Sequence, residues 1–275
     1  MRKRTVRDIA ARKGGEKLTM LTAYDASMAA LLDSCGVDML LVGDSLGMVV
    51  LGYASTVPVT MEEMLHHAAA VSRSTQHALV VGDMPFGSYQ EDRSLTVRNG
   101  VRFLKEGGCD AVKLEGGEEV CQGVEALVRA GVPVMGHLGL TPQTAGQLGG
   151  FKVQGRDLET ARKILADARR LEDAGVFAIV LECVPGPLAR EITARIGVPT
   201  IGIGAGADCD GQVLVSNDMF GIFEKFTPGF VKKYLDLAPM LRNAVQQFRD
   251  EVASGAFPGP EHTFGLDAEY ADLDE

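Results

Sequence analysis

The sequence lacks any apolar run that approaches the roughly 18 residues of a membrane-spanning helix. The basic first segment, residues 1–17, lacks the apolar stretch of a secretory signal peptide. Cysteine is also scarce, with five residues, an odd number, and no C-x-x-C pair. We therefore expect reduced thiols, no membrane partner and a cytoplasmic location.

A surplus of positive charge is missing as well. The chain carries 27 Lys and Arg against 37 Asp and Glu, a formal net charge of −10 at pH 7. This balance argues against nucleic acid as a general partner, because the phosphate backbone would be repelled. Small anionic substrates stay compatible with this charge where a local cation or a metal ion receives them.

What the sequence does contain is a recurring pattern in which an apolar run ends at an acid. The run 40–42 leads to Asp44, and similar runs lead to Asp83, Glu115 and Glu182. Near-continuous apolar runs are typical of buried parallel strands. Because the carboxyl ends of parallel strands lie at one edge of a sheet or barrel, the four acids are expected to converge on one site.

Strand and helix patterns alternate along the chain. The predicted strands cover 18–25, 38–45, 78–85, 111–116, 133–138, 178–184, 199–204 and 212–217. The predicted helices cover 26–35, 60–75, 91–106, 118–130, 157–174, 187–196 and 231–253. Eight strands alternating with helices favour an α/β fold, a closed (β/α)8 TIM barrel.

The two ends of the chain are expected to have roles of their own. Thr5 and Asp8 form a capping-box pattern, which predicts a short helix at the bottom of the barrel. We expect one barrel domain over 1–255 and an acidic C-terminal tail over 256–275, since the last ten residues hold five acids.

Three acids on one rim repel one another strongly. Two like charges ~4 Å apart cost about 4 kcal/mol at an effective dielectric constant of ~20. Either some carboxyls are protonated or a cation lies among them. Oxygen ligands without His or Cys at metal-binding spacing favour a hard ion, Mg²⁺ first. We therefore predict Asp44, Asp83 and Glu115 as metal ligands, directly or through water; a helix N-cap or a rim salt bridge is the alternative for each.

Strand alternation assigns two further candidates. Lys113 shares a face with Glu115 and is expected one layer deeper, paired with that acid or with a substrate carboxylate. Glu182 is expected across the barrel from the metal acids, well placed as a general base. Its neighbour Cys183 is then expected to point toward the helices as a packing residue.

Three features leave alternatives open. His137 ends the fifth strand and would contact substrate, donate a hydrogen bond behind the ligands, or simply lie at the rim. Ser45 would donate to a bound anion or cap the following turn. The glycine-rich segment 202–206 would hold a phosphate or allow close packing at the rim, and it lacks the acid that a dinucleotide fingerprint requires.

Seven longer motifs are distinctive: Met20–Asp25, Val42–Met48, Ser55–Thr60, Gly82–Tyr89, Val112–Gly117, Gly136–Gln143 and Leu181–Pro185. They resemble, in order, the ketopantoate hydroxymethyltransferase (3-methyl-2-oxobutanoate hydroxymethyltransferase) family. The match runs from about Thr5 to about Gly255, and the length of the motifs makes it highly specific.

The resemblance implies a TIM barrel of the phosphoenolpyruvate/pyruvate type, a Mg²⁺ ion and a homodecamer. It implies transfer of a hydroxymethyl group from 5,10-methylenetetrahydrofolate to 3-methyl-2-oxobutanoate through a Mg-stabilised enolate. The product would be 2-dehydropantoate, in the first step of pantothenate and coenzyme A biosynthesis.

The resemblance also implies residue roles. The positions that match the family's metal residues are Asp44, Asp83 and Glu115. The positions that match its oxoacid-binding residues are Asp44, Ser45, Asp83 and Lys113. Glu182 matches its proton acceptor, and His137 is a further candidate contact for the substrate.

Two other classes of function compete with this one. A lyase that splits a C–C bond of a 2-oxoacid or phosphonate would use the same scaffold, but such lyases usually carry a reactive cysteine on a mobile loop. The long loop 139–156 has no cysteine. A non-catalytic protein that binds small anions would need no base opposite the metal, and Glu182 argues against it.

Overall fold

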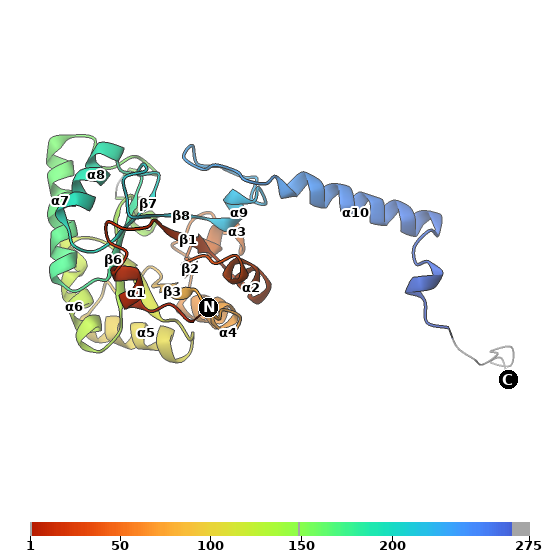
Figure 1. Ribbon diagram of the computed structural model, residues 1–275, viewed down its shortest axis with the longest axis horizontal. Helices are drawn as coiled ribbons and strands as arrows, with labels where there is room; N and C mark the ends of the chain where they lie inside the picture. The colour runs from red at the N-terminus through yellow and green to blue at the C-terminus, as the bar shows by residue number, and fades with distance from the viewer. Residues whose placement is uncertain (1, 148, 266–275) are drawn as a thin grey trace.

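Eight apolar runs form a closed barrel of parallel strands in the computed structural model, which describes residues 2–147 and 149–265 (Figure 1). The strands are β1 (Leu18–Thr22), β2 (Met39–Val42), β3 (Leu79–Asp83), β4 (Ala111–Glu115), β5 (Val134–Gly139), β6 (Ala178–Glu182), β7 (Thr200–Ile203) and β8 (Gly211–Leu214). They pair in chain order, and β8 closes on β1. The predicted (β/α)8 fold is confirmed, and each predicted strand is present.

Helices surround the barrel, as predicted (Figure 1). The main ones are α2 (Ala26–Ser34), α4 (Met61–Arg73), α5 (Arg93–Lys105), α6 (Cys121–Arg129), α7 (Leu158–Asp173) and α8 (Gly186–Arg195). Side-chain caps set several of their first turns, because an oxygen at the N-cap satisfies an otherwise free N–H. Asp92 accepts from the N–H of Leu95 at 2.8 Å, and Asp157 accepts from that of Thr160 at 2.9 Å.

Short helical segments occur in the connections, where the sequence pattern is too brief to predict them. They are α3 (Leu46–Val49), η1 (Glu118–Val120), η2 (Pro142–Thr144), α9 (Ser216–Met219) and η3 (Pro260–His262). Among the described residues, no helix has both the length and the apolar character needed to cross a bilayer.

Strand alternation divides the core into two layers. Val112 and Leu114 of β4 face outward and share a buried cluster with Val124 and Leu127 of α6. Ala111 faces the barrel interior, in a second cluster that includes residues of every strand. The side chains of β4 beyond Ala111 that share its face therefore lie inside the barrel, toward its C-terminal end.

The bottom of the barrel is closed by α1 (Val6–Ala10), as the capping-box pattern predicts. Thr5 and Asp8 make both hydrogen bonds of that box. Ile9 of α1 is fully buried and packs in the interior cluster with Leu18 and Met20. The basic first segment is thus part of the fold.

Three aspartates at this end repeat one structural role. Each precedes an even-numbered strand and accepts the N–H of the first or second residue of the neighbouring odd-numbered strand. The pairs are Asp38 with Thr19 (2.8 Å), Asp110 with Val80 (2.8 Å) and Asp210 with Thr200 (2.9 Å). Their cationic partners come from the first segment: Arg4, Lys3 and Lys13, at 2.8, 2.9 and 3.0 Å respectively.

The last helix, α10 (Leu237–Ser254), begins later than the predicted 231–253. The N–H groups of Tyr234 and Leu237 donate to carbonyls of Met219 and Phe220, so the preceding segment folds back on α9 instead of continuing the helix. From there α10 extends away from the barrel (Figure 1). Residues 266–275 of the predicted acidic tail lie outside the described residues.

Asp210 should contribute strongly to stability. Burial alone would raise its pKa, but hydrogen bonds from the N–H groups of Thr200 and Gly14 and the Lys13 ammonium lower it. We expect Asp210→Asn to reduce the free energy of unfolding by about 2–4 kcal/mol in urea titrations at pH 7, because buried donors and a cation lose their partner.

The pH dependence gives a second readout for Asp210. A lowered folded-state pKa means that the contribution is complete above about pH 4 and is lost as the pH falls through that pKa. The difference in the free energy of unfolding between wild type and Asp210→Asn should therefore become smaller in acid. The exposed Asp208→Asn is the control and should change little; an equal effect of the two substitutions would contradict the assigned role.

Candidate active site

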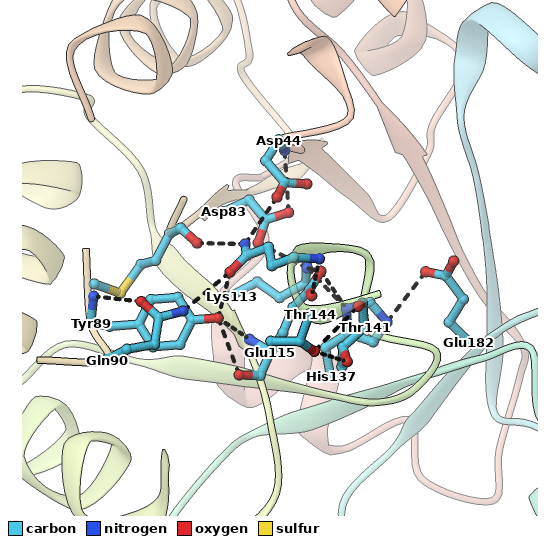
Figure 2. A network of polar contacts seen from close by, with 12 residues as sticks. Asp44, Asp83, Tyr89, Gln90, Lys113, Glu115, His137, Thr141, Thr144 and Glu182 are labelled. Atoms are coloured by element: carbon cyan, nitrogen blue, oxygen red, sulfur yellow. Dashed lines mark hydrogen bonds and ion pairs between the residues drawn. The ribbon is translucent and has the colours of Figure 1, made fainter. Parts of the chain in front are cut away.

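The predicted site residues surround one cavity of about 320 Å³ at the C-terminal end of the barrel. They are Asp44, Ser45, Asp83, Lys113, Glu115, His137 and Glu182, and all of them line it. Most belong to one network of polar contacts (Figure 2). Because β2 to β6 are adjacent in the barrel, the ends of their strands bring these side chains together.

Lys113 lies at the centre of this network. Its register on β4 places it beside Asp83 of β3, and its Nζ lies 2.8 Å from Asp83 Oδ1 and 3.8 Å from Glu115 Oε1 (Figure 2). The ammonium is only 3% exposed, and its carboxylate neighbours raise its pKa against the effect of burial. The pairing with Glu115 is present, but the shorter contact is with Asp83.

The carboxylates around Lys113 carry more negative charge than it neutralises. Burial, together with the charges of Asp83 and Glu115, raises the pKa of Asp44 well above its ordinary value. Burial also raises the pKa of Asp83, although Lys113 opposes the shift. Glu115 differs: burial would raise its pKa, but His137 and Lys113 lower it. A further cation would therefore stabilise the ionised forms of Asp44 and Asp83 more than that of Glu115.

Mg²⁺ is compatible with this donor set. The three acids offer only oxygen, are at most 4% exposed, and include one oxygen, Asp83 Oδ1, without an aligned hydrogen bond within the described residues. They are not preassembled as a cage: in the described part of the chain, no three His, Cys, Asp or Glu side chains form a metal-binding group. Lys113 and Gln143 bind carboxylate oxygens instead.

Gln143 is a central residue that the sequence analysis missed. Its amide Nε2 donates to Asp44 Oδ2 at 2.9 Å, its backbone N–H donates to Glu115 Oε2 at 3.0 Å, and its Oε1 accepts from the Tyr89 hydroxyl at 2.6 Å. Gln143 therefore links the ends of β2, β3 and β4 through its side chain and its backbone N–H. Its position directly after Pro142, in a long loop at the catalytic end, was the available signal.

His137 connects the acid network to Glu182. Its Nδ1 lies 3.3 Å from Glu115 Oε1, and its Nε2 lies 3.3 Å from Glu182 Oε2 (Figure 2). Burial and the Lys113 charge would lower its pKa, but the two carboxylates outweigh them and raise it to about 9. A protonated imidazole between Glu115 and Glu182 fits the interpretation of His137 as a donor behind the reacting groups.

Cys183 does not point into the helix layer, so that expectation was wrong. It has φ of 49°, in the left-handed region, and it lines the same cavity as Glu182. Alternation holds only in extended backbone, and β6 ends at Glu182. The backbone carbonyl of Cys183 accepts a hydrogen bond from the N–H of Gln154, with 2.9 Å between the nitrogen and the oxygen. This bond attaches the long loop after β5 to the site.

The structure also bears on two of the open alternatives. Ser45 makes no side-chain capping bond to α3; its Oγ lies 2.9 Å from the Tyr24 hydroxyl and lines the cavity. At Gly204, with φ of 62°, an added Cβ would lie 2.8 Å from the Phe230 ring. The glycine-rich segment therefore serves close packing at this position.

Comparisons with known proteins agree with this geometry. A model of the ketopantoate hydroxymethyltransferase family matches residues 3–260. The 3-methyl-2-oxobutanoate hydroxymethyltransferase of Desulfotalea psychrophila is 65% identical over 270 residues, which cover 98% of this chain and 97% of that protein.

Solved structures share the barrel at low identity. Phosphoenolpyruvate phosphomutase from Streptomyces platensis subsp. rosaceus matches with a TM-score of 0.62 at 15% identity, over 92% of this chain and 88% of that one. Phosphonopyruvate hydrolase in complex with oxalate and Mg²⁺ matches with a TM-score of 0.58 at 12% identity, over 94% and 93%. These likenesses show a shared barrel fold, and the sequence match decides the family: the chain belongs to the ketopantoate hydroxymethyltransferase family.

Proposed function

We propose that this protein transfers a hydroxymethyl group from 5,10-methylenetetrahydrofolate to 3-methyl-2-oxobutanoate, giving 2-dehydropantoate in the first step of pantothenate biosynthesis. Its relatives carry the name of this activity. The observation that carries the proposal is the buried network of Lys113, His137 and three carboxylates, with Glu182 at its edge. Such a set can bind an anionic oxoacid and remove a proton next to its keto group.

Substrate binding is assigned to the inner part of the cavity. Lys113 supplies a buried positive charge for the oxoacid carboxylate, and Ser45 supplies a hydroxyl held in place by Tyr24. Asp44 and Asp83 lie beside these groups and complete the oxoacid-binding set, with His137 behind them. A preorganised set of this kind lowers the cost of orienting the substrate.

Glu182 is the proposed proton acceptor. Its side chain is 16% exposed, so the carboxylate can be reached from the cavity, and His137 Nε2 limits its orientation. In the reaction Glu182 takes the proton from C3 of the oxoacid. That carbon then bonds to the methylene carbon of the folate donor, and water supplies the hydroxyl oxygen. The bonds from the methylene carbon to the two folate nitrogens break, those nitrogens receive the C3 proton and one proton of the water, and tetrahydrofolate leaves.

Asp44, Asp83 and Glu115 are the residues proposed to hold Mg²⁺. When bound, this ion polarises the keto oxygen and thereby makes the neighbouring C3–H more acidic. The oxygen-only donors and their excess negative charge support the assignment. So does the shared fold of phosphonopyruvate hydrolase, whose complex contains both Mg²⁺ and oxalate, a small dicarboxylate.

The first experiment follows hydrogen–deuterium exchange at C3 of 3-methyl-2-oxobutanoate by NMR, with Mg²⁺ and without folate. We expect Glu182→Gln to slow this exchange at least about 100-fold, because the variant keeps the size of the side chain but loses the base. Glu159→Gln, at an exposed acid of α7, should exchange at the wild-type rate. Undiminished exchange in Glu182→Gln would refute the role of this residue.

We further propose a homo-oligomer, a homodecamer as the family resemblance implies, in the cytoplasm. Residues 1–255 would form its functional unit, with 256–275 as an acidic extension. The oligomer is supported by α10, which lies apart from the barrel and has an apolar stripe that is half or more exposed (Figure 1). The stripe consists of Met240, Leu241, Val245, Phe248 and Val252. We propose that a second copy of the chain covers it, since such a stripe is unfavourable in water.

Two charges in this stripe should reduce the assembly. We expect the double substitution Val245→Asp and Phe248→Asp to lower the mass measured by light scattering, because each aspartate would be buried without a partner. Asn243→Asp, on the opposite side of α10, should leave the mass unchanged. An unaltered mass in the double variant, with folding checked by circular dichroism, would remove α10 from the interface.

A further inference from the structure

One carboxylate of the cavity lies outside the acid network. Asp218, in α9, lines the cavity and is only 7% exposed. Within the described residues its carboxylate accepts no hydrogen bond and has no ion-pair partner within 4.0 Å; Lys233 acts on it only from a longer distance. A carboxylate on a cavity wall that receives no hydrogen bond from the protein is free to accept hydrogen bonds from a ligand that brings its own N–H groups.

The backbone around Asp218 is firmly held. The hydroxyl of Thr22 in β1 accepts the N–H of Ser216 at 2.9 Å and lies 3.2 Å from the Ser216 Oγ. Asn217 reaches the carbonyl of Val49 at 3.5 Å. These contacts attach α9 to β1 and to the end of α3, so the backbone that carries Asp218 is held in place before any ligand arrives.

Four phenylalanine side chains line the same cavity, and we call the part that they line its outer part. Phe151 comes from the loop after β5, whereas Phe223, Phe226 and Phe230 come from the segment between α9 and α10. Phe151 and Phe226 are 57% and 61% exposed, so their rings are accessible to a ligand. Accessible apolar rings from two separate segments suit a flat aromatic ligand.

A ligand for this outer part must therefore be planar, with adjacent N–H donors along one edge. The 2-amino-4-oxopyrimidine ring of a reduced folate has this form, because its ring N–H and its 2-amino group point the same way. A carboxylate can accept both hydrogen bonds at once, as it does from an arginine fork. Burial raises the pKa of Asp218 to about 6, which leaves the group mostly ionised at neutral pH.

We propose that Asp218 binds the pterin ring of the one-carbon donor through its ring N–H and 2-amino group, between the aromatic walls of the outer cavity. This inference rests on the proposed function, since the folate donor belongs to that reaction. It makes Asp218 a binding residue for the second substrate, separate from the acids assigned to the oxoacid and the metal ion.

The test compares wild type with Asp218→Asn in two assays. Loss of the charged acceptor should raise the KM for 5,10-methylenetetrahydrofolate, and the Kd for tetrahydrofolate measured by calorimetry, by at least about tenfold. Folate-free C3 exchange of 3-methyl-2-oxobutanoate should keep its wild-type rate, which also shows that the variant is folded. The exposed Asp208→Asn is the matched control and should leave both assays unchanged.

A folate analogue sharpens the result. A tetrahydrofolate with a 2-methyl group in place of the 2-amino group should bind wild type more weakly but should lose little further affinity in Asp218→Asn. An unchanged KM and Kd for the natural folate in Asp218→Asn would overturn the inference while leaving the oxoacid half-reaction intact. Absence of C3 exchange in wild type would instead count against the proposed function itself.

Discussion

The site depends on an imbalance of charge that the barrel keeps away from water. The Lys113 ammonium and the His137 imidazole lie among the carboxylates of Asp44, Asp83 and Glu115, which outnumber them, and all five side chains are buried. Solvent cannot screen the repulsion between the carboxylates at this depth, so an additional positive charge beside them is electrostatically favourable. The proposed metal binding and the binding of an oxoacid beside Lys113 both follow from that preference.

The two ends of the barrel use the same residue type in opposite ways. At the bottom, the hydrogen bonds and cation around Asp210 lower its pKa, and the carboxylate contributes to stability. At the top, burial and the neighbouring carboxylates raise the pKa values of Asp44 and Asp83. Perturbation of this second kind is characteristic of functional sites, which in barrels lie at the C-terminal ends of the strands.

Much of this arrangement could be predicted from the sequence because strand patterns are local. The apolar runs identified the eight strands, and the acids that follow them identified one rim of the barrel. Alternation placed Lys113 and Glu115 inside, since β4 is extended throughout. It failed at Cys183, where the backbone leaves the extended region one residue after the strand ends.

Other features depend on contacts between distant segments, which no local pattern reports. Gln143 acquires its role only when the loop after β5 folds over the acids of β2 and β4. Asp218 stands out because donors are missing around it, a property of packing that the residue type does not reveal. The late start of α10 likewise follows from backbone bonds to α9.

Metal binding by the charged network can be measured by titrating MgCl2 into the protein in the presence of 3-methyl-2-oxobutanoate and following the heat released. We expect one Mg²⁺ per chain for wild type and at least about tenfold weaker binding in Asp83→Asn. The exposed Asp208→Asn should bind Mg²⁺ like wild type. Equal affinity in Asp83→Asn and wild type, or no Mg²⁺ uptake by wild type with the oxoacid present, would contradict metal binding by this network.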